Sequence, residues 1–266
     1  MSDACVYLVG AGPGDPELLT IKALRLIERA DVVVYDRLVS TEIIELIPAG
    51  VSKIFVGKVT GRHSLAQEEI NQLLVALAKG HRRIVRLKGG DPFLFGRGGE
   101  EAITLAEHRI NFEIIPGITS AMACAAYAGI PMTHRGLADG VRFMTGHRQA
   151  DAELAFDQHA LADQNCTIAI YMGLANLEPI VKALLNAGRP LSTPVAVIEQ
   201  GTTQRQRRLV STLSTLIVDL KRAEMTPPSM VVIGEVVTLA KTLAWFEPDI
   251  DQSLAQPIDQ SGQCLR

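Results

Sequence analysis

The segment 86–102, RLKGGDPFLFGRGGEEA, constrains the fold of this chain more than any other stretch. It begins at the end of an apolar run with β character, Ile84–Leu87, and ends in two glutamates that can open a helix. Gly89 and Gly90 allow a sharp backbone turn and a close approach of a ligand to backbone N–H and C=O groups. Asp91 precedes a proline, which biases it away from helical geometry and holds its carboxylate at the loop exit. The segment therefore predicts a strand, a ligand-binding loop and a helix in succession.

A second glycine-rich turn follows the first apolar run of the chain. Val6–Val9 leads into GAGPGD at 10–15 and then into a helical pattern, an arrangement that points backbone N–H groups and a helix dipole at a ligand. Asp36 lies at the distance expected of a dinucleotide fingerprint. However, Asp15 replaces the third glycine, and Pro13 removes one phosphate-binding N–H. A nicotinamide-dependent oxidoreductase is therefore an alternative that leaves the GGDP sequence unexplained.

Strand and helix signals alternate along the chain, which predicts an α/β fold with ligand sites at the carboxyl ends of parallel strands. The β runs of the first half are Val6–Val9, Asp31–Asp36, Lys53–Val56, Ile84–Leu87 and Phe112–Ile115. After the turn-rich segment 131–140 come Val141–Thr145, Thr167–Met172, Val195–Glu199, Val210–Thr212 and Met230–Ile233. We expect two α/β domains, residues 1–133 and 134–247, followed by a disordered tail, 248–266.

Composition narrows the class of protein further. The 266 residues carry a net charge of −3, which argues against a general nucleic-acid binder. The four cysteines are scattered, so we expect reduced thiols and neither a disulfide framework nor a zinc site. No signal peptide is expected in the first 30 residues. The uncharged stretch Ile114–Thr133 is long enough to span a bilayer, but its prolines, glycines and alanines favour a closely packed buried helix.

Seven motifs occur in one order, and together they resemble the tetrapyrrole methyltransferase family, a resemblance that covers about residues 5–247. They are VGAGPGDPELLT, DVVVYDRLVS, VGK, VRLKGGDPFLFGRGGEEA, PGITSAMACAAYAGIPMTHR, YMG and EQGTTQRQR. The resemblance implies the tetrapyrrole methylase fold, with S-adenosylmethionine in a cleft between the domains and no metal. It implies two successive methyl transfers to uroporphyrinogen III, giving precorrin-2 by way of precorrin-1, for siroheme or cobalamin. It further implies a cytoplasmic homodimer that binds no nucleic acid or membrane, in the stand-alone form without a dehydrogenase–chelatase module.

The resemblance also assigns residues. Cofactor contacts carry over onto Pro13, Gly89, Gly90, Asp91, Leu94, Thr119, Ser120, Met172 and Gly201. The proposed proton acceptor matches Asp36 and the proposed donor matches Lys58, although Asp36 can instead cap a helix or hold Arg37, and Lys58 can instead bind a substrate carboxylate.

A substrate with acetate and propionate arms requires arginines, because a guanidinium pairs with a carboxylate through two hydrogen bonds. Arg97, between glycines, is the strongest candidate and is expected to contribute to catalysis. The other candidates are Arg62, Arg135, Arg148, His134 and His147. Glu100 is expected to orient Arg97 or bind a pyrrole N–H, with capping of the helix as the alternative.

Two further functions stay open, a methyltransferase for a later corrin intermediate and a non-catalytic sensor of S-adenosylmethionine.

Overall fold

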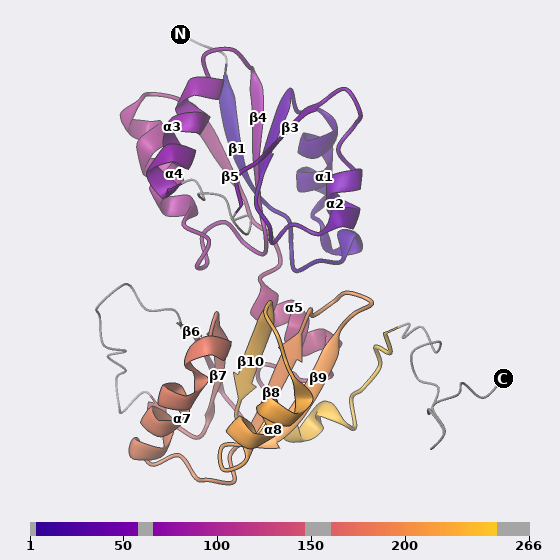
Figure 1. Ribbon diagram of the computed structural model, residues 1–266, viewed down its shortest axis with the longest axis vertical. Helices are drawn as coiled ribbons and strands as arrows, with labels where there is room; N and C mark the ends of the chain where they lie inside the picture. Colours follow the sequence, from indigo (N-terminus) through magenta and orange to yellow (C-terminus); the bar gives the residue numbers. More distant parts are fainter. Residues whose placement is uncertain (1–3, 58–65, 147–160, 249–266) are drawn as a thin grey trace, which may run out of the picture.

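The protein, described from a computed structural model that defines residues 4–57, 66–146 and 161–248, has two lobes, each built around one five-stranded sheet (Figure 1). The first sheet has the order β3-β2-β4-β1-β5, and all of its strand pairs are parallel. Its strands are β1 (Cys5–Gly10), β2 (Val32–Tyr35), β3 (Ser52–Phe55), β4 (Arg83–Lys88) and β5 (Asn111–Ile115). The parallel α/β architecture expected of the first half of the chain is confirmed.

Helices cover both faces of the first sheet. Side chains of α3 (Gln67–Leu77) and α4 (Gly98–Glu107) share one hydrophobic cluster with strand residues such as Ile84. Side chains of α1 (Ile21–Glu28) and α2 (Thr41–Glu45) share the other cluster with Val85 and Leu87. Alternate residues of β4 thus face opposite layers, as the pleat of a strand requires. A 3₁₀ helix, η1 (Pro16–Leu18), precedes α1.

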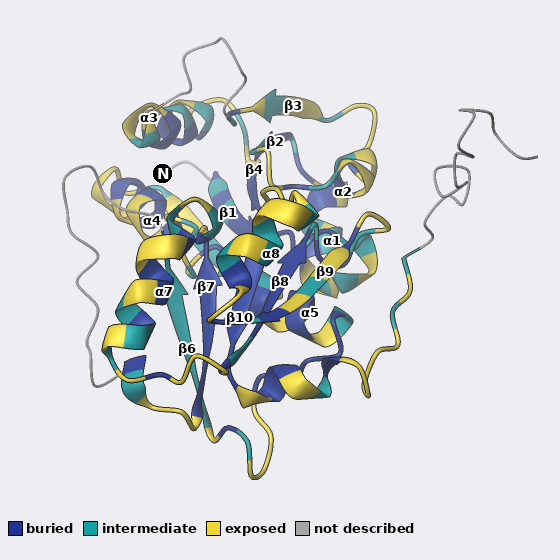
Figure 2. Ribbon diagram, turned by 60° about the horizontal axis from the view of Figure 1, so that its bottom comes forward, coloured by how far each residue is buried: buried dark blue, intermediate teal, exposed yellow. Residues whose placement is uncertain are grey.

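The second sheet has the order β6-β7-β10-β8-β9 and is mixed. Only β6 and β7 pair in parallel, and the remaining neighbours are antiparallel. Its strands are β6 (Gly140–Thr145), β7 (Cys166–Tyr171), β8 (Pro194–Glu199), β9 (Arg207–Thr212) and β10 (Ser229–Ile233). Its helical elements are α5 (Ser120–Tyr127), α7 (Leu177–Asn186), α8 (Leu216–Ala223), η2 (Leu174–Asn176) and η3 (Glu235–Ala240). The interior of this lobe is β7, β8 and β10, which are buried, whereas β6 is only half-buried (Figure 2).

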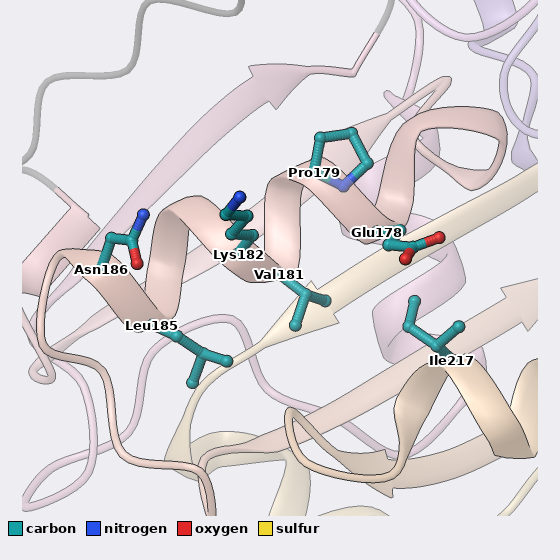
Figure 3. Close-up of a pocket in the computed structure, with 7 residues that line it drawn as sticks. All are labelled: Glu178, Pro179, Val181, Lys182, Leu185, Asn186 and Ile217. Carbon is teal, nitrogen blue, oxygen red and sulfur yellow. The ribbon is translucent and has the colours of Figure 1, made fainter.

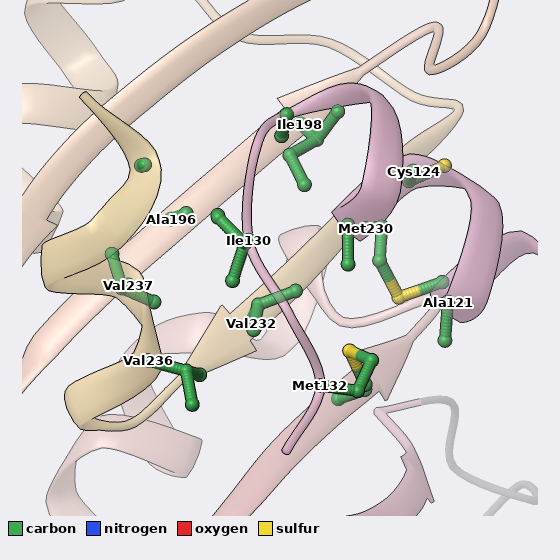
Figure 4. Close-up of a cluster of buried hydrophobic side chains, with 14 of the residues drawn as sticks. Ala121, Cys124, Ile130, Met132, Ala196, Ile198, Met230, Val232, Val236 and Val237 are labelled. Atoms are coloured by element: carbon green, nitrogen blue, oxygen red, sulfur yellow. The ribbon is translucent and has the colours of Figure 1, made fainter. Parts of the chain in front are cut away.

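Helix α5 packs against the second sheet although it directly follows the last strand of the first. Ala121 and Cys124 lie in one hydrophobic cluster with Met230 and Val232 of β10 (Figure 4). The packing therefore changes from one lobe to the other between β5 and α5, earlier than the boundary expected between residues 133 and 134. The uncharged stretch around α5 forms a short packed helix, and among the described residues no helix is long and apolar enough to cross a membrane.

Three glycines meet where β1, β4 and β5 leave the first sheet. A Cβ atom added to Gly10 would lie 2.6 Å from the Cα atom of Gly117 and 2.7 Å from the carbonyl oxygen of Gly90. Beside this crossing, Gly12 and Gly90 exchange two backbone hydrogen bonds, of 3.1 Å and 2.6 Å between nitrogen and oxygen. The missing side chains therefore let three loop backbones touch at the carboxyl edge of the sheet.

We predict that Gly117→Ala lowers the free energy of unfolding by about 1–3 kcal/mol, because its Cβ would collide with the carbonyl oxygen of Gly90. Urea unfolding followed by circular dichroism measures this change. The control is Gly80→Ala, because nothing lies within 4 Å of a Cβ at that position. Equal unfolding midpoints for the two variants would contradict the crossing.

Candidate active site at the carboxyl edge of the first sheet

The loop after β4 is fastened to the exit of β5 by one carboxylate. Oδ1 of Asp91 accepts a hydrogen bond from the backbone N–H of Phe93 at 2.8 Å, and Oδ2 accepts one from that of Gly117 at 3.1 Å. Farther along the loop, the N–H of Gly98 donates to the carbonyl of Pro92 at 3.0 Å. These bonds close the loop on itself and hold Gly90 in the crossing of the three glycines, with Gly89 next to it.

The second lobe meets this loop at Tyr171, the last residue of β7. Its hydroxyl lies 2.6 Å from Oγ1 of Thr119 and accepts a hydrogen bond from the N–H of Ala121 at 3.3 Å. The hydroxyl thereby satisfies an otherwise free amide of the first turn of α5. The ring contacts Phe95 of the loop, with 4.9 Å between centroids. Burial raises the pKa of the Tyr171 hydroxyl, and its hydrogen bonds with Thr119 and Ala121 oppose that shift.

Predicted cofactor residues from both lobes lie around this contact. Met172 follows Tyr171, is half exposed and has a positive φ of 53°, a strained value for a residue with a side chain. Ser120 lies at the start of α5, and a Cβ added to Gly90 would be 3.5 Å from its Oγ. Leu94 packs against the hydrophobic cluster that contains Ala121.

The loop 200–203 approaches the first glycine turn from the second lobe. A Cβ on Gly14 would lie 3.0 Å from a methyl group of Thr203 and 3.3 Å from Oγ1 of Thr202. The N–H of Asp15 donates to Oγ1 of Thr202 at 3.2 Å, and Oδ2 of Asp15 accepts from the hydroxyl of Tyr127 at 2.7 Å. These contacts bring the Pro13 turn and the Gly201 loop, both predicted to bind cofactor, to the same place.

Asp36 follows β2 and joins a buried charge cluster. Its Oδ1 accepts a hydrogen bond from the N–H of Leu38 at 3.1 Å, and its Oδ2 lies 3.3 Å from Nη2 of Arg86. A Cβ on Gly89 would lie 2.7 Å from the Cβ of Leu38, so the Asp36 turn adjoins the loop after β4. The two alternative roles expected of Asp36 are not the ones observed, because its arginine partner is Arg86 and not Arg37, and the cap of the following helix, α2, is Ser40.

Arg97 and Glu100 pair with one another at the start of α4. Nε and Nη2 of Arg97 donate to the two carboxylate oxygens of Glu100 at 2.8 Å and 2.6 Å. The hydrogen bond from Arg97 lowers the pKa of Glu100. Both side chains are more than half exposed, so the pair contributes at most about 1 kcal/mol and an anionic ligand can replace Glu100. The interpretation in which Glu100 orients Arg97 agrees with this geometry.

The structure does not bring Arg135 to this edge. Arg135 and His134 line a separate hollow of about 560 Å³ with Asp139 and Asn165, before β6. Because β6 and β7 run parallel, the loop that enters β6 lies beside Cys166, the first residue of β7, whereas Tyr171 is its last residue. The length of β7 between these two residues is about 17 Å at a rise of about 3.3 Å per residue. The other candidates, Lys58, Arg62, His147 and Arg148, lie outside the described residues.

Two negative findings delimit the site. The pocket in Figure 3, about 480 Å³, lies between α7 and Ile217 of α8 and is lined by none of the predicted site residues. Among residues 4–57, 66–146 and 161–248, no group of three or more His, Cys, Asp or Glu side chains is placed to hold a metal ion.

Sequence reasoning missed the buried charges beneath Asp36: Arg86 pairs with Asp36 and with Glu101, and Glu101 also pairs with Lys88. A signal was present, because Arg86 and Lys88 alternate with apolar residues in a central strand, where an unpaired charge is expensive to bury. Glu101 likewise shares a helix face with Thr104 and Leu105, both buried.

The chain matches known proteins over most of its length. The sequence model of the family described as Tetrapyrrole (Corrin/Porphyrin) Methylases matches residues 5–217. The chain is 54% identical over 244 residues to siroheme synthase of Nitrosospira multiformis, covering 92% of this chain and 52% of that protein. It thus spans about half the length of the curated relatives that it matches.

Two solved structures are similar in fold as well. One is uroporphyrin-III C-methyl transferase from Thermus thermophilus complexed with S-adenyl homocysteine. It has 41% sequence identity and a TM-score of 0.77, covering 89% of this chain and 100% of that one. The other is a cobalamin biosynthetic enzyme, cobalt precorrin-4 methyltransferase, with 29% identity and a TM-score of 0.78 over 89% of this chain and 97% of that one.

The Tyr127–Asp15 contact between the lobes predicts a pH dependence. Burial, followed by the hydrogen bond to Asp15, raises the pKa of Tyr127 to about 12, whereas an unfolded tyrosine ionises near about 10. Ionisation at high pH therefore favours the unfolded chain first, so the contribution of Tyr127 to stability is complete below pH ~10 and is lost towards pH ~12. We expect the difference in unfolding free energy between wild type and Tyr127→Phe to be larger at pH 9 than at pH 11 by urea titration. A difference independent of pH would contradict this.

Proposed function

The chain belongs to the tetrapyrrole (corrin/porphyrin) methylase family, and from that premise we propose that it transfers methyl groups from S-adenosylmethionine to uroporphyrinogen III. We propose two successive transfers, which yield precorrin-1 and then precorrin-2 for siroheme or cobalamin. The observation that carries the proposal is that four loops, after β1, β4, β5 and β7, meet through the Gly10–Gly90–Gly117 crossing and the Tyr171–Thr119 contact. A homodimer in the cytoplasm and action without a metal are part of the same proposal and rest on the family resemblance alone.

The residues at this meeting point fit the methyl donor. The glycines carry no side chains, so a ligand can approach their backbones closely, which suits the amino acid and ribose parts of the donor. Apolar side chains beside them are exposed, with Met172 at 51%, Met122 at 48% and Ile118 at 38% of their surface, and they can cover its adenine and methylene groups. Gly89, Gly90, Asp91, Thr119 and Ser120 would hold the donor from one side. Pro13, Leu94, Met172 and Gly201 would complete the site.

The donor supplies a methyl group on a positively charged sulfur, which leaves as a neutral thioether. The protein has to hold the acceptor carbon in line with that bond, and positioning of this kind can supply about 7–11 kcal/mol of a barrier. The acceptor is a pyrrole carbon, a weak nucleophile, so removal of a proton from the ring system promotes the reaction. We assign the removal of this proton to Oδ2 of Asp36. Lys58 is the proposed donor that returns a proton, and Arg97 is proposed to bind the substrate carboxylates.

A nicotinamide-dependent dehydrogenase fits less well. In dinucleotide-binding sheets β1 and β2 are neighbours, so the glycine turn and the acid after β2 bind one nucleoside. Here β4 lies between β1 and β2, and Asp36 faces Arg86 of that strand instead of the turn at Gly12.

Anaerobic incubation with uroporphyrinogen III and isotopically labelled donor tests the proposal. We expect a product with two added methyl groups, identified by mass and by the absorbance of precorrin-2. The similarity to a methyltransferase for a later intermediate makes cobalt precorrin-4 the second substrate to offer. Methyl transfer to that substrate and none to uroporphyrinogen III would overturn the proposed substrate.

We predict that Asp91→Ala weakens binding of S-adenosylhomocysteine by about tenfold or more, because the loop loses both hydrogen bonds of the carboxylate. Calorimetric titration measures the change, and binding of the tetrapyrrole should change less. The matched control is Asp163→Ala, which removes a similar turn contact to Asn165 at the far end of β7. Equal affinities for the two variants would exclude Asp91 from the cofactor site.

A further inference from the structure

Three charged side chains are buried beneath Asp36 on one face of the first sheet. Arg86 and Lys88 are exposed over only 2% and 3% of their surface, and Glu101 over none. Arg86 and Lys88 follow Ile84 at alternate positions of β4, so all three face the layer of α3 and α4, from which Glu101 projects. Val34 of β2 lies in the same layer, and Asp36 continues that face beyond the end of the strand.

The guanidinium of Arg86 is shared among three acceptors. Its Nε donates to Oε1 of Glu101 at 3.0 Å, its Nη1 to the carbonyl oxygen of Leu87 at 3.0 Å, and its Nη2 to Oδ2 of Asp36 at 3.3 Å. A pair that served stability alone would be expected to place two parallel bonds on one carboxylate. The distribution over three directions instead fixes the plane of the guanidinium and presents one edge of it to Asp36.

Glu101 is the only carboxylate with which the described structure pairs Lys88. Its Oε1 accepts from Arg86, from Nζ of Lys88 at 2.9 Å and from Nε2 of Gln67 at 3.3 Å, whereas its Oε2 has no partner among the described residues. Burial and the charge of Arg86 lower the pKa of Lys88, and Glu101 opposes this shift. One carboxylate oxygen therefore holds two cations that would otherwise repel each other.

We propose that Glu101 is a positioning residue, which acts through Arg86 to fix the carboxylate of Asp36 for the reaction. The proposal rests on the proposed function, in which Asp36 contacts the substrate. Glu101 itself is completely buried and contacts no reactant. A contribution to folding stability does not by itself explain this buried cluster, because apolar side chains in place of a buried ion pair often stabilise the folded protein as much or more.

The test is Glu101→Gln, which keeps the shape and removes the charge. We expect kcat/KM for methyl transfer to uroporphyrinogen III to fall at least about tenfold, while the affinity for S-adenosylhomocysteine stays within about twofold. The matched control is Glu107→Gln, an exposed carboxylate on the same helix, which should keep wild-type turnover. Loss of cofactor binding together with turnover, or wild-type turnover in Glu101→Gln, would overturn the proposal.

A double-mutant cycle separates positioning from a general structural effect. If Glu101 acts through Asp36, the variant Asp36→Asn/Glu101→Gln should lose no more single-turnover rate than Asp36→Asn alone. If the fold-losses in single-turnover rate of the two single variants instead multiply in the double variant, the proposal is overturned. If thermal unfolding shows that Glu101→Gln does not fold, the charge-balanced variant Lys88→Met/Glu101→Gln replaces it in the same cycle, with the same expected result.

Failure of this inference is distinct from failure of the proposed function. A wild-type protein that methylates uroporphyrinogen III beside an equally active Glu101→Gln variant refutes the positioning role alone. A wild-type protein that binds S-adenosylhomocysteine but methylates no tetrapyrrole refutes the proposed function, on which the positioning role depends.

Discussion

Three backbones touch without side chains between them where β1, β4 and β5 end, and the site depends on that contact. Gly10 and Gly117 leave no room for a Cβ at the crossing, and Gly90 has a positive φ of 68°, which a residue with a side chain rarely adopts. The contact brings the loop after β4 close enough to β5 for Asp91 to accept a hydrogen bond from Gly117. A larger residue at Gly10 or Gly117 would separate the loops, and the backbone surface that the donor is proposed to bind would open.

The same edge is where the second lobe joins the first. Helix α5 follows the crossing directly and packs on the second sheet, and its first turn receives the hydroxyl of Tyr171. Asp15 on the first glycine turn bonds with both Thr202 and Tyr127 of the second lobe. Backbone groups of the first lobe and exposed apolar side chains of the second thus line one place, a combination suited to a ligand that is part polar and part apolar.

The buried charged side chains of the first lobe differ from the exposed ones in their freedom to exchange partners. Arg97 and Glu100 pair in solvent, where a substrate carboxylate can exchange for Glu100 at little expense. Arg86 and Lys88 have no such freedom, because each depends on the buried Glu101. The exposed pair suits exchange with ligands, and the buried group suits a fixed orientation of Asp36.

The strands could be predicted from the sequence because they depend on local patterns of residues. Every predicted β run lies in an observed strand or overlaps one, because apolar runs bounded by glycine, proline and polar turns are local patterns. The strand at Arg207–Thr212 begins earlier than expected, since its first two residues are charged and gave no apolar signal. Arg135 was chosen because its segment is rich in turns, but its distance from Tyr171 depends on the direction of β6, which no local pattern encodes.

The sequence by itself determined the order of strands and helices, the glycine turns at strand ends and the family, because these depend on residues near one another in the chain. Only the tertiary structure decided the mixed second sheet, the lobe to which α5 belongs and the burial of Arg86, Lys88 and Glu101 beneath Asp36. Those features arise from contacts between residues far apart in the chain, and such contacts depend on which strands pair and in which direction.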